Sequence, residues 1–158
     1  MSEPVDLSHI DPSGQARMVD ISSKSPTSRE ARAEAFVRIG SEALDLLRAN
    51  KLKKGDALGV SKIAGITAAK RTSELIPLCH PIALTDIDVV LEVEPEGVRI
   101  SSRVKTTDRT GVEMEALVAA SVAALTLYDM CKSAQRDITI DTIQLISKSG
   151  GRSGDWER

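Results

Sequence analysis

The residues best suited to acid–base chemistry are Asp129 and Lys132, near the end of a long apolar stretch of the chain. Residues three positions apart share one face of a helix, so this carboxylate and this ammonium group would lie side by side. If that face lines a cleft, the pair could act as proton acceptor and donor, with a lowered lysine pKa allowing exchange near neutral pH. The alternative, which the spacing by itself favours, is an exposed ion pair worth only about a few tenths of a kcal/mol.

A constrained loop carries a second reactive pair, Cys79 and His80, between Pro77 and Pro81. Pro81 restricts His80 to extended backbone geometry, so the segment cannot continue a helix. The loop could present His80 to a ligand, or it could simply cap the core and leave a histidine at the surface. Adjacent Cys and His side chains cannot easily face one ion, because zinc ligands are usually spaced further apart, and we expect no metal site.

The beginning of the apolar stretch and the last residues of the chain offer two further binding segments. Gly111 precedes a predicted helix whose first turn holds Glu113 and Glu115, where free amide groups can bind an anion. The two acids oppose an anion and could instead bind a base edge or a cation, unless they only cap the helix. Lys148, in a glycine-rich segment, could bind a phosphate; the P-loop pattern is absent, and a flexible tail is the alternative.

The spacing along the predicted helix separates two of these groups. Glu115 and Asp129 are 14 residues apart, which is roughly 21 Å at a rise of about 1.5 Å per residue. One small-ligand pocket in a single chain cannot easily include both side chains. If both serve one site, we expect that site to lie between two subunits.

Hydropathy patterns predict the elements that must position these residues. Apolar and charged residues alternate over 29–39, which is typical of a half-buried strand, although the alanine content also suits a helix. Ser41 is expected to cap a first helix that closes by Gly55. Asp56 is expected to cap a second helix that ends near Arg71.

The second half of the chain alternates between strand and helix patterns. Segments 85–94 and 98–105 alternate on either side of a turn at 95–97, which predicts a β-hairpin with one buried face. A long helix is predicted over 112–134 and a last strand over 138–147.

The element order predicts an α+β fold of ferredoxin-like type, in which two long helices pack on one face of an antiparallel sheet. We expect a single domain over residues 1–158, with an irregular N-terminal arm at 1–28 and a glycine-rich C-terminal tail at 149–158. This architecture hosts many functions, so it does not by itself predict an activity.

The composition excludes several classes of function. The chain has 158 residues and a net charge of −2, which argues against bulk electrostatic binding to nucleic acid or to an anionic membrane. Its three aromatic residues are too few for a base-stacking platform. Two cysteines provide no disulfide framework, so a reducing cytoplasmic location is the simpler prediction. The uncharged run 116–128 is shorter than the ~20 residues that span a bilayer, and no secretory signal fits the start.

Seven strings of residues, in this order, make the sequence recognisable: 18–22, 54–56, 63–72, 75–81, 110–117, 127–132 and 148–156. Together they resemble the family of cyclic pyranopterin monophosphate synthase, the molybdenum cofactor biosynthesis protein C. The resemblance runs over about 9–156, and none of the motifs that we connect with function departs from the family pattern.

The resemblance implies a lyase that acts on (8S)-3′,8-cyclo-7,8-dihydroguanosine 5′-triphosphate. The product would be cyclic pyranopterin monophosphate, with diphosphate released. The reaction opens the five-membered ring of the guanine, rebuilds a pterin and closes a cyclic phosphate, without a redox change. No organic cofactor is expected, although Mg²⁺ could accompany the triphosphate. The family assembles as a hexamer, a trimer of dimers, with sites between subunits, which agrees with the separation of Glu115 and Asp129.

The resemblance also assigns roles to individual residues. Asp129 matches the catalytic acid/base, Lys132 matches the catalytic lysine, and His80 would transfer a proton or contact a phosphate. Glu115 would recognise the amide and amine edge of the purine-derived ring by accepting two N–H donors. The other residues expected to contact the substrate or its phosphates are Leu78, Cys79, Glu113, Met114, Lys54, Lys70, Arg71 and Lys148, with Arg17, Arg29 and Arg109 behind them.

A function from a different class stays open beside the enzyme. A nucleotide-binding regulatory module of the same ferredoxin-like fold would need cations to hold phosphates but no acid/base pair. The combination of Asp129 and Lys132 with Lys54 and Lys70 is the sequence feature that favours the enzyme.

Overall fold

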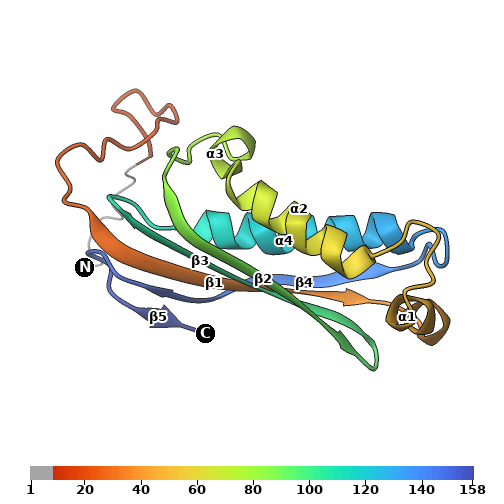
Figure 1. The fold of residues 1–158 in the computed structure, drawn as a ribbon. Helices are drawn as coiled ribbons and strands as arrows, with labels where there is room; N and C mark the ends of the chain where they lie inside the picture. The colour runs from red at the N-terminus through yellow and green to blue at the C-terminus, as the bar shows by residue number, and fades with distance from the viewer. Residues whose placement is uncertain (1–8) are drawn as a thin grey trace.

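The computed structural model describes residues 9–158, and Figure 1 shows a sheet with helices on one face. The strands are β1 (Thr27–Arg38), β2 (Leu84–Glu94), β3 (Gly97–Asp108), β4 (Thr139–Ser149) and β5 (Trp156–Glu157). The helices are α1 (Ser41–Arg48), α2 (Ala57–Ala69), α3 (Thr72–Leu75) and α4 (Glu113–Cys131). The strand order in the sheet is β2-β3-β1-β4-β5, and neighbouring strands are antiparallel. The predicted α+β class of ferredoxin-like type is confirmed.

β1 lies in the middle of the sheet, between β3 and β4. Its residues Ala31, Ala33, Ala35 and Val37 are at most 1% exposed, whereas none of the residues between them is buried. The period of two therefore prevails over the helix propensity of alanine, because a strand places all four side chains on one face. These small side chains form the surface on which α4 packs.

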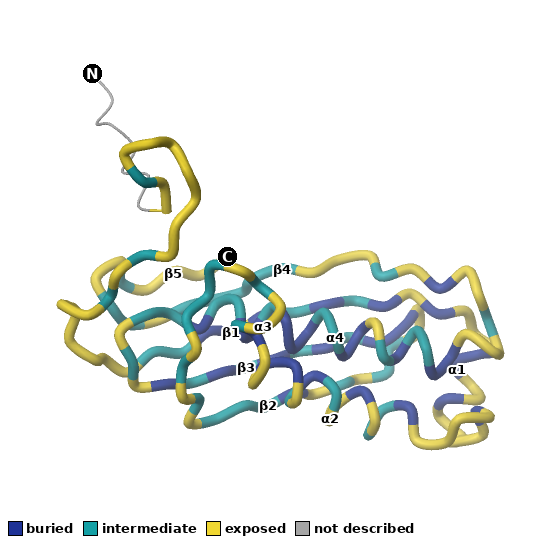
Figure 2. Tube along the Cα trace, turned by 90° about the horizontal axis from the view of Figure 1, so that it is seen from above, coloured by how far each residue is buried: buried dark blue, intermediate teal, exposed yellow. Residues whose placement is uncertain are grey.

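The two long helices lie side by side on the same face of the sheet (Figures 1 and 2). α4 packs on β1, β3 and β4, and α2 packs on α4 and β2. The helices approach so closely at Gly65 that a Cβ there would lie 2.8 Å from the carbonyl oxygen of Ala119. α2 begins as predicted after Asp56, whose carboxylate accepts a hydrogen bond from the Gly59 amide at 2.9 Å. This packing holds the ends of both helices, where the predicted site residues lie.

The beginning of α1 differs from the prediction. Gly40, and not Ser41, is the N-cap, and Ser41 is the first helical residue. Gly40 has the extended backbone (φ −69°, ψ 158°) that a capping position requires. Its amide donates a hydrogen bond to the side-chain oxygen of Gln135 at 2.8 Å, a tertiary contact that the local pattern does not contain.

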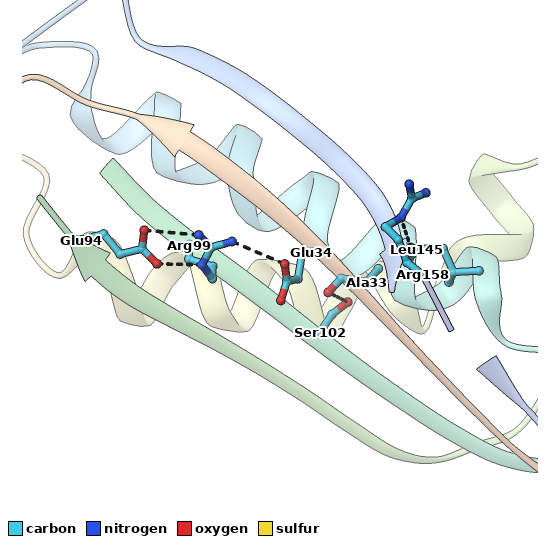
Figure 3. Close-up of polar contacts among 7 residues, drawn as sticks. All are labelled: Ala33, Glu34, Glu94, Arg99, Ser102, Leu145 and Arg158. Carbon is cyan, nitrogen blue, oxygen red and sulfur yellow. Dashed lines mark hydrogen bonds and ion pairs between the residues drawn. The ribbon is translucent and has the colours of Figure 1, made fainter. Parts of the chain in front are cut away.

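The last part of the chain is also more regular than predicted. α4 ends at Cys131 rather than Ala134, because the Ala134 amide donates to the Cys131 carbonyl in a tighter turn. The tail contains β5, which pairs with β4, and Arg158 donates to the carbonyl of Leu145 at 3.0 Å (Figure 3). At the other end, the arm predicted over 1–28 is two residues too long, because β1 begins at Thr27. The first eight residues of the arm lie outside the described part of the chain.

The two faces of the sheet have different chemistry. On the face away from the helices, the guanidinium of Arg99 lies between Glu94 and Glu34, at 2.7 Å and 3.4 Å (Figure 3). On the covered face, the buried Ser102 hydroxyl donates to the Ala116 carbonyl of α4 at 2.7 Å. The predicted site residues gather at the two ends of α4, on the helical side.

Candidate functional site

The C-terminal end of α4 carries a carboxylate between two ammonium groups. Asp129 lies 2.5 Å from the amine of Lys54 and 2.7 Å from the amine of Lys132. Lys54 comes from the turn before α2, which Gly55 completes with a φ of +85°. We call Lys54, Asp129 and Lys132 the lysine cluster; all three side chains are about half exposed. The predicted pairing of Asp129 with Lys132 is confirmed, and Lys54 joins it from 75 positions away.

The charges of the lysine cluster stabilise one another. Hydrogen bonds from Lys132 and Lys54 lower the pKa of Asp129 to about 2. The same contact with Asp129 raises the pKa of Lys132. The expectation of a lowered lysine pKa is therefore wrong for this chain, because an adjacent carboxylate favours the charged ammonium. At neutral pH the cluster offers two fixed cations and one ionised carboxylate.

The N-terminal end of α4 lines a cavity, which is a site of a different kind. A cavity of about 280 Å³ lies between the start of α4, the loop after α3 and the N-terminal arm. We call it the arm cavity. Its lining includes Leu78, Cys79, His80, Thr110 and Glu115, together with Val19, Ile21 and Lys24 of the arm. The loop and the helix start that the sequence indicated separately are thus brought together.

Glu115 is the buried acid of the arm cavity. It is 4% exposed, and this burial raises its pKa to about 7, with a smaller contribution from the charge of Glu113. Burial, and then the charge of Glu115, also raises the pKa of Cys79. A carboxyl group that titrates near neutrality can donate or accept a proton there. When ionised, it can accept two N–H donors from a ligand.

His80 lies in the same cavity, in contact with the arm. Its ring nitrogen Nε2 is 2.7 Å from the carbonyl oxygen of Val19. The structure therefore favours the binding loop over a surface histidine, because the ring is half-buried and faces other candidate groups. Val19, Ile21 and Lys24 had no predicted role; segment 18–22 was only one of the strings that carry the family resemblance, with no sign of what it covers.

Other predicted residues lie near the N-terminal end of α4. Lys148 of β4 is 3.4 Å from the carboxylate of Glu113 and donates to the Ser153 hydroxyl at 2.7 Å. The Lys148 amine, which was predicted to bind a phosphate, is therefore paired with Glu113 and Ser153 in this structure. Met114 follows Glu113 in the first turn of α4 and is half-buried.

The remaining predicted cations are placed elsewhere. Lys70 and Arg71 are exposed at the end of α2 and line neither the arm cavity nor the lysine cluster. Arg29 donates to the carbonyls of Asp108 and Arg109, so it holds the end of β3. Arg17 is exposed in the arm.

The structure keeps the two groups of candidate residues apart within one chain. The lysine cluster is at the C-terminal end of α4 and the arm cavity is at its N-terminal end. Figure 1 shows the course of the helix between them. The 14 residues between Glu115 and Asp129 correspond to roughly 21 Å of helix. One continuous helix confirms the predicted separation, which a small ligand cannot easily span within one chain.

Metal-binding groups and membrane-spanning helices are the next two features to consider in the described residues. Among residues 9–158, no three His, Cys, Asp or Glu side chains are grouped closely enough to bind a metal ion. In the same residues, α4 is long and apolar enough to cross a membrane. However, 56% of its most apolar window is buried in the molecule, where α4 packs on three strands.

Carboxyl groups with strongly shifted pKa values lie at both ends of a core helix, an arrangement often found at functional sites. The model of the MoaC family matches residues 18–151, which is nearly the whole chain. The chain therefore belongs to the MoaC family, and its function lies in molybdenum cofactor biosynthesis, in the synthesis of a pterin. The resemblance in the sequence is confirmed at the level of the family.

Proposed function

We propose that this chain converts (8S)-3′,8-cyclo-7,8-dihydroguanosine 5′-triphosphate into cyclic pyranopterin monophosphate, releasing diphosphate as a phosphorus–oxygen lyase. Membership of the MoaC family supports the pathway. The observation that carries the proposal is the position of Asp129 between Lys54 and Lys132. A regulatory module would need the two cations but not the carboxylate between them.

The lysine cluster suits the closure of the cyclic phosphate. An alkoxide of the substrate attacks the innermost phosphorus, and the bond to the diphosphate leaving group breaks. Lys54 and Lys132 stabilise the negative charge that develops on the phosphate oxygens. Asp129, which is ionised at neutral pH, accepts the proton that the attacking hydroxyl loses.

The arm cavity suits the nitrogen-rich ring of the substrate. Glu115 accepts N–H donors from the amide and amine edge, and the cavity supplies them with a buried acceptor. His80 exchanges a proton during ring opening and pterin formation. Leu78, Cys79 and Met114 pack around the ring, while Lys148 and Glu113 lie at the same end of α4.

We further propose that two chains form each site, within a hexamer built as a trimer of dimers. α2 and α4 have apolar residues on their outer sides as well as toward the core, and Ile63 and Leu125 are 63% and 58% exposed. Helices that are apolar all round are normally covered. A two-fold axis across these helices would place the lysine cluster of one chain beside the arm cavity of the other. The positive and the acidic ends would then face each other.

The proposed reaction also implies which cofactors and which cellular compartment the protein uses. We propose that no organic cofactor takes part, because the reaction has no net redox change, and that Mg²⁺ can accompany the triphosphate. We also propose a cytoplasmic location. Cys79 and Cys131 are both free thiols, as a reducing compartment would keep them.

Diphosphate release tests the proposed reaction directly. Purified protein is given the 3′,8-cyclised dihydro-GTP, with GTP as the control substrate. We expect release from the cyclised nucleotide alone, lost in Lys132→Ala and retained in Lys105→Ala. Lys105 is a matched control because its amine also pairs with a carboxylate, that of Glu30 at 3.2 Å, and neither residue belongs to the lysine cluster or lines the arm cavity.

The same assay separates the two classes of function. If wild-type protein binds the nucleotide tightly by calorimetry but releases no diphosphate, the chain is a binding module and the proposed reaction is wrong. If Lys132→Ala turns over at the wild-type rate, the lysine cluster is not the reaction centre. In both cases circular dichroism must show that the variants are folded.

A further inference from the structure

The contact between His80 and the arm joins segments that are far apart in sequence. Nε2 of His80 is 2.7 Å from the carbonyl oxygen of Val19, across 61 positions of the chain. Both residues also line the arm cavity together with the buried Glu115. The arm thus provides a hydrogen-bond partner for Nε2, and the Val19 carbonyl does not contact the other ring nitrogen, Nδ1.

The chemistry of the two groups decides where the imidazole carries its hydrogen. A carbonyl oxygen has lone pairs but no hydrogen, so Nε2 must be the donor in this bond. Neutral imidazole has only one N–H, which leaves the free lone pair on Nδ1. When Nδ1 takes up a proton, the bond from Nε2 persists, because both nitrogens of imidazolium are donors. His80 can therefore accept and return a proton at Nδ1 while its ring stays oriented.

Local hydrogen bonds hold both sides of this contact in place. On the arm, the Ser22 amide donates to the Asp20 carboxylate at 2.9 Å. Hydrogen bonds from Ser22 lower the pKa of Asp20, so the carboxylate that forms this turn is ionised at neutral pH. On the loop, the Cys79 amide donates to the Ile76 carbonyl at 3.1 Å, next to the residue that Pro81 restricts.

We infer that the arm positions His80. The Val19 carbonyl accepts the hydrogen bond from Nε2–H, and the turn at Asp20 fixes the position of that carbonyl. Nδ1 is then the atom that exchanges the proton. In the reaction, a proton that leaves a substrate oxygen or nitrogen goes to Nδ1, and the same proton returns from Nδ1 to the product. Only this use of the proton rests on the proposed function. The other titratable groups in the arm cavity are Glu115, Lys24, Cys79 and His9, and Asp20 of the arm also interacts with the charge of His80.

Nuclear magnetic resonance of the resting protein tests the hydrogen bond without any substrate. The full chain carries ¹⁵N-labelled histidine and ¹³C-labelled carbonyl groups, and a His9→Gln variant assigns the signals of the two histidines. We expect a directly observed Nε2–H of His80 that exchanges slowly with water. We also expect a scalar coupling from Nε2 to the carbonyl carbon of Val19.

Two variants of the arm form a matched pair for this measurement. Asp20→Ala removes the turn next to Val19, and we expect the slow exchange and the coupling to disappear. Asp11→Ala removes a similar turn, in which Asp11 accepts from the Ser13 amide at 2.9 Å, and we expect both signals to remain. The inference is overturned if neutral His80 carries its hydrogen on Nδ1. It is also overturned if Nε2–H exchanges as fast in wild type as in Asp20→Ala.

Turnover then shows whether the contact positions a catalytic group. We expect Asp20→Ala to lower kcat about 10- to 100-fold, as misplaced catalytic groups do, with a smaller change in KM. In a His80→Gln background, Asp20→Ala should have no further effect on kcat, because the group that it positions is already gone. Glutamine is chosen because its amide can still donate to Val19.

The outcomes separate this inference from the proposed function. If Asp20→Ala lowers kcat equally in both backgrounds, the turn is only structural and the positioning role is wrong. If the wild-type protein shows no turnover, the proposed function fails while the hydrogen bond is still decided by the spectra.

Discussion

Two carboxyl groups on the same helix lie in opposite environments. Asp129, at the C-terminal end of α4, is about half exposed between two ammonium groups and has a pKa of about 2. Glu115, at the N-terminal end, is buried in the arm cavity and has a pKa of about 7. One chemical group thus has two different proton affinities within one helix.

The difference shows that neighbours, and not residue type, decide what each acid can do. Opposite charges within hydrogen-bonding distance stabilise the ionised form of Asp129, whereas loss of water stabilises the protonated form of Glu115. At neutral pH Asp129 is therefore an anion that orders two lysines, and Glu115 is a group that can change protonation when a ligand arrives. Pairs of acids whose pKa values are pushed apart are a common arrangement in acid–base enzymes.

The largest expected effect comes from removing the charge of Asp129. We expect Asp129→Asn to lower kcat about 10²- to 10⁴-fold, the usual contribution of a general acid or base, in the diphosphate-release assay. Asp45→Asn is the matched control, since Asp45 of α1 forms an ion pair with Arg48, also three residues away on a helix, and is not part of the lysine cluster. If both variants keep the wild-type rate, the lysine cluster is an ordinary surface ion pair.

The second prediction joins the two regions across a subunit boundary. Asp129→Asn and Glu115→Ala should each be nearly inactive alone, but mixed subunits should regain up to about a quarter of the wild-type rate. A two-fold dimer with one variant of each kind has one intact site out of two, and half of the dimers are mixed. Absence of recovery at every mixing ratio, after subunit exchange is shown, would mean that each chain builds its own site.

The third prediction concerns the stability of the buried acid. The folded state raises the pKa of Glu115, so it binds a proton that the unfolded chain releases above about pH 4.5. Wild-type stability should therefore fall between pH 5 and pH 7 relative to Glu115→Gln, by up to about 3 kcal/mol at pH 8. Urea denaturation at pH 5 and pH 8 measures this. A constant difference between the two proteins would show that Glu115 ionises normally.

The smallest expected effect is the contribution of Asp129 to stability. Its lowered pKa stabilises the folded state above about pH 4, and this contribution is lost as the pH falls through about 2. Because the pair is half exposed, solvent screens it, and Asp129→Asn should be only slightly less stable than wild type at neutral pH. Thermal denaturation should show the two curves converging at acidic pH. A large deficit at neutral pH would contradict the exposed geometry.

Much of the fold could be predicted from local patterns. The alternation in β1 and in the β2–β3 hairpin is visible in the sequence, because one face of each strand is buried. The cap of α2 at Asp56 was predictable too, since the carboxylate and the amide that it accepts from are three residues apart. The family strings also lie within short segments, so the family was recognisable from the sequence.

The contacts that the prediction missed are made by residues far apart along the chain. The cap of α1 depends on Gln135, 95 positions from Gly40, and the pairing of β5 depends on the return of the tail to β4. Lys54 reaches Asp129 from 75 positions away. Hydropathy and capping rules relate residues that are only a few positions apart, so they could not have predicted these long-range contacts.

The sequence by itself determined the residue types, the helix spacing that separates Glu115 from Asp129, and the family. Only the tertiary structure decided the charge states of those residues, because a pKa depends on burial and on neighbours brought together by folding. The same holds for the arm: nothing in segment 18–21 indicates His80, and the carbonyl of Val19 becomes its partner only when the arm covers the loop.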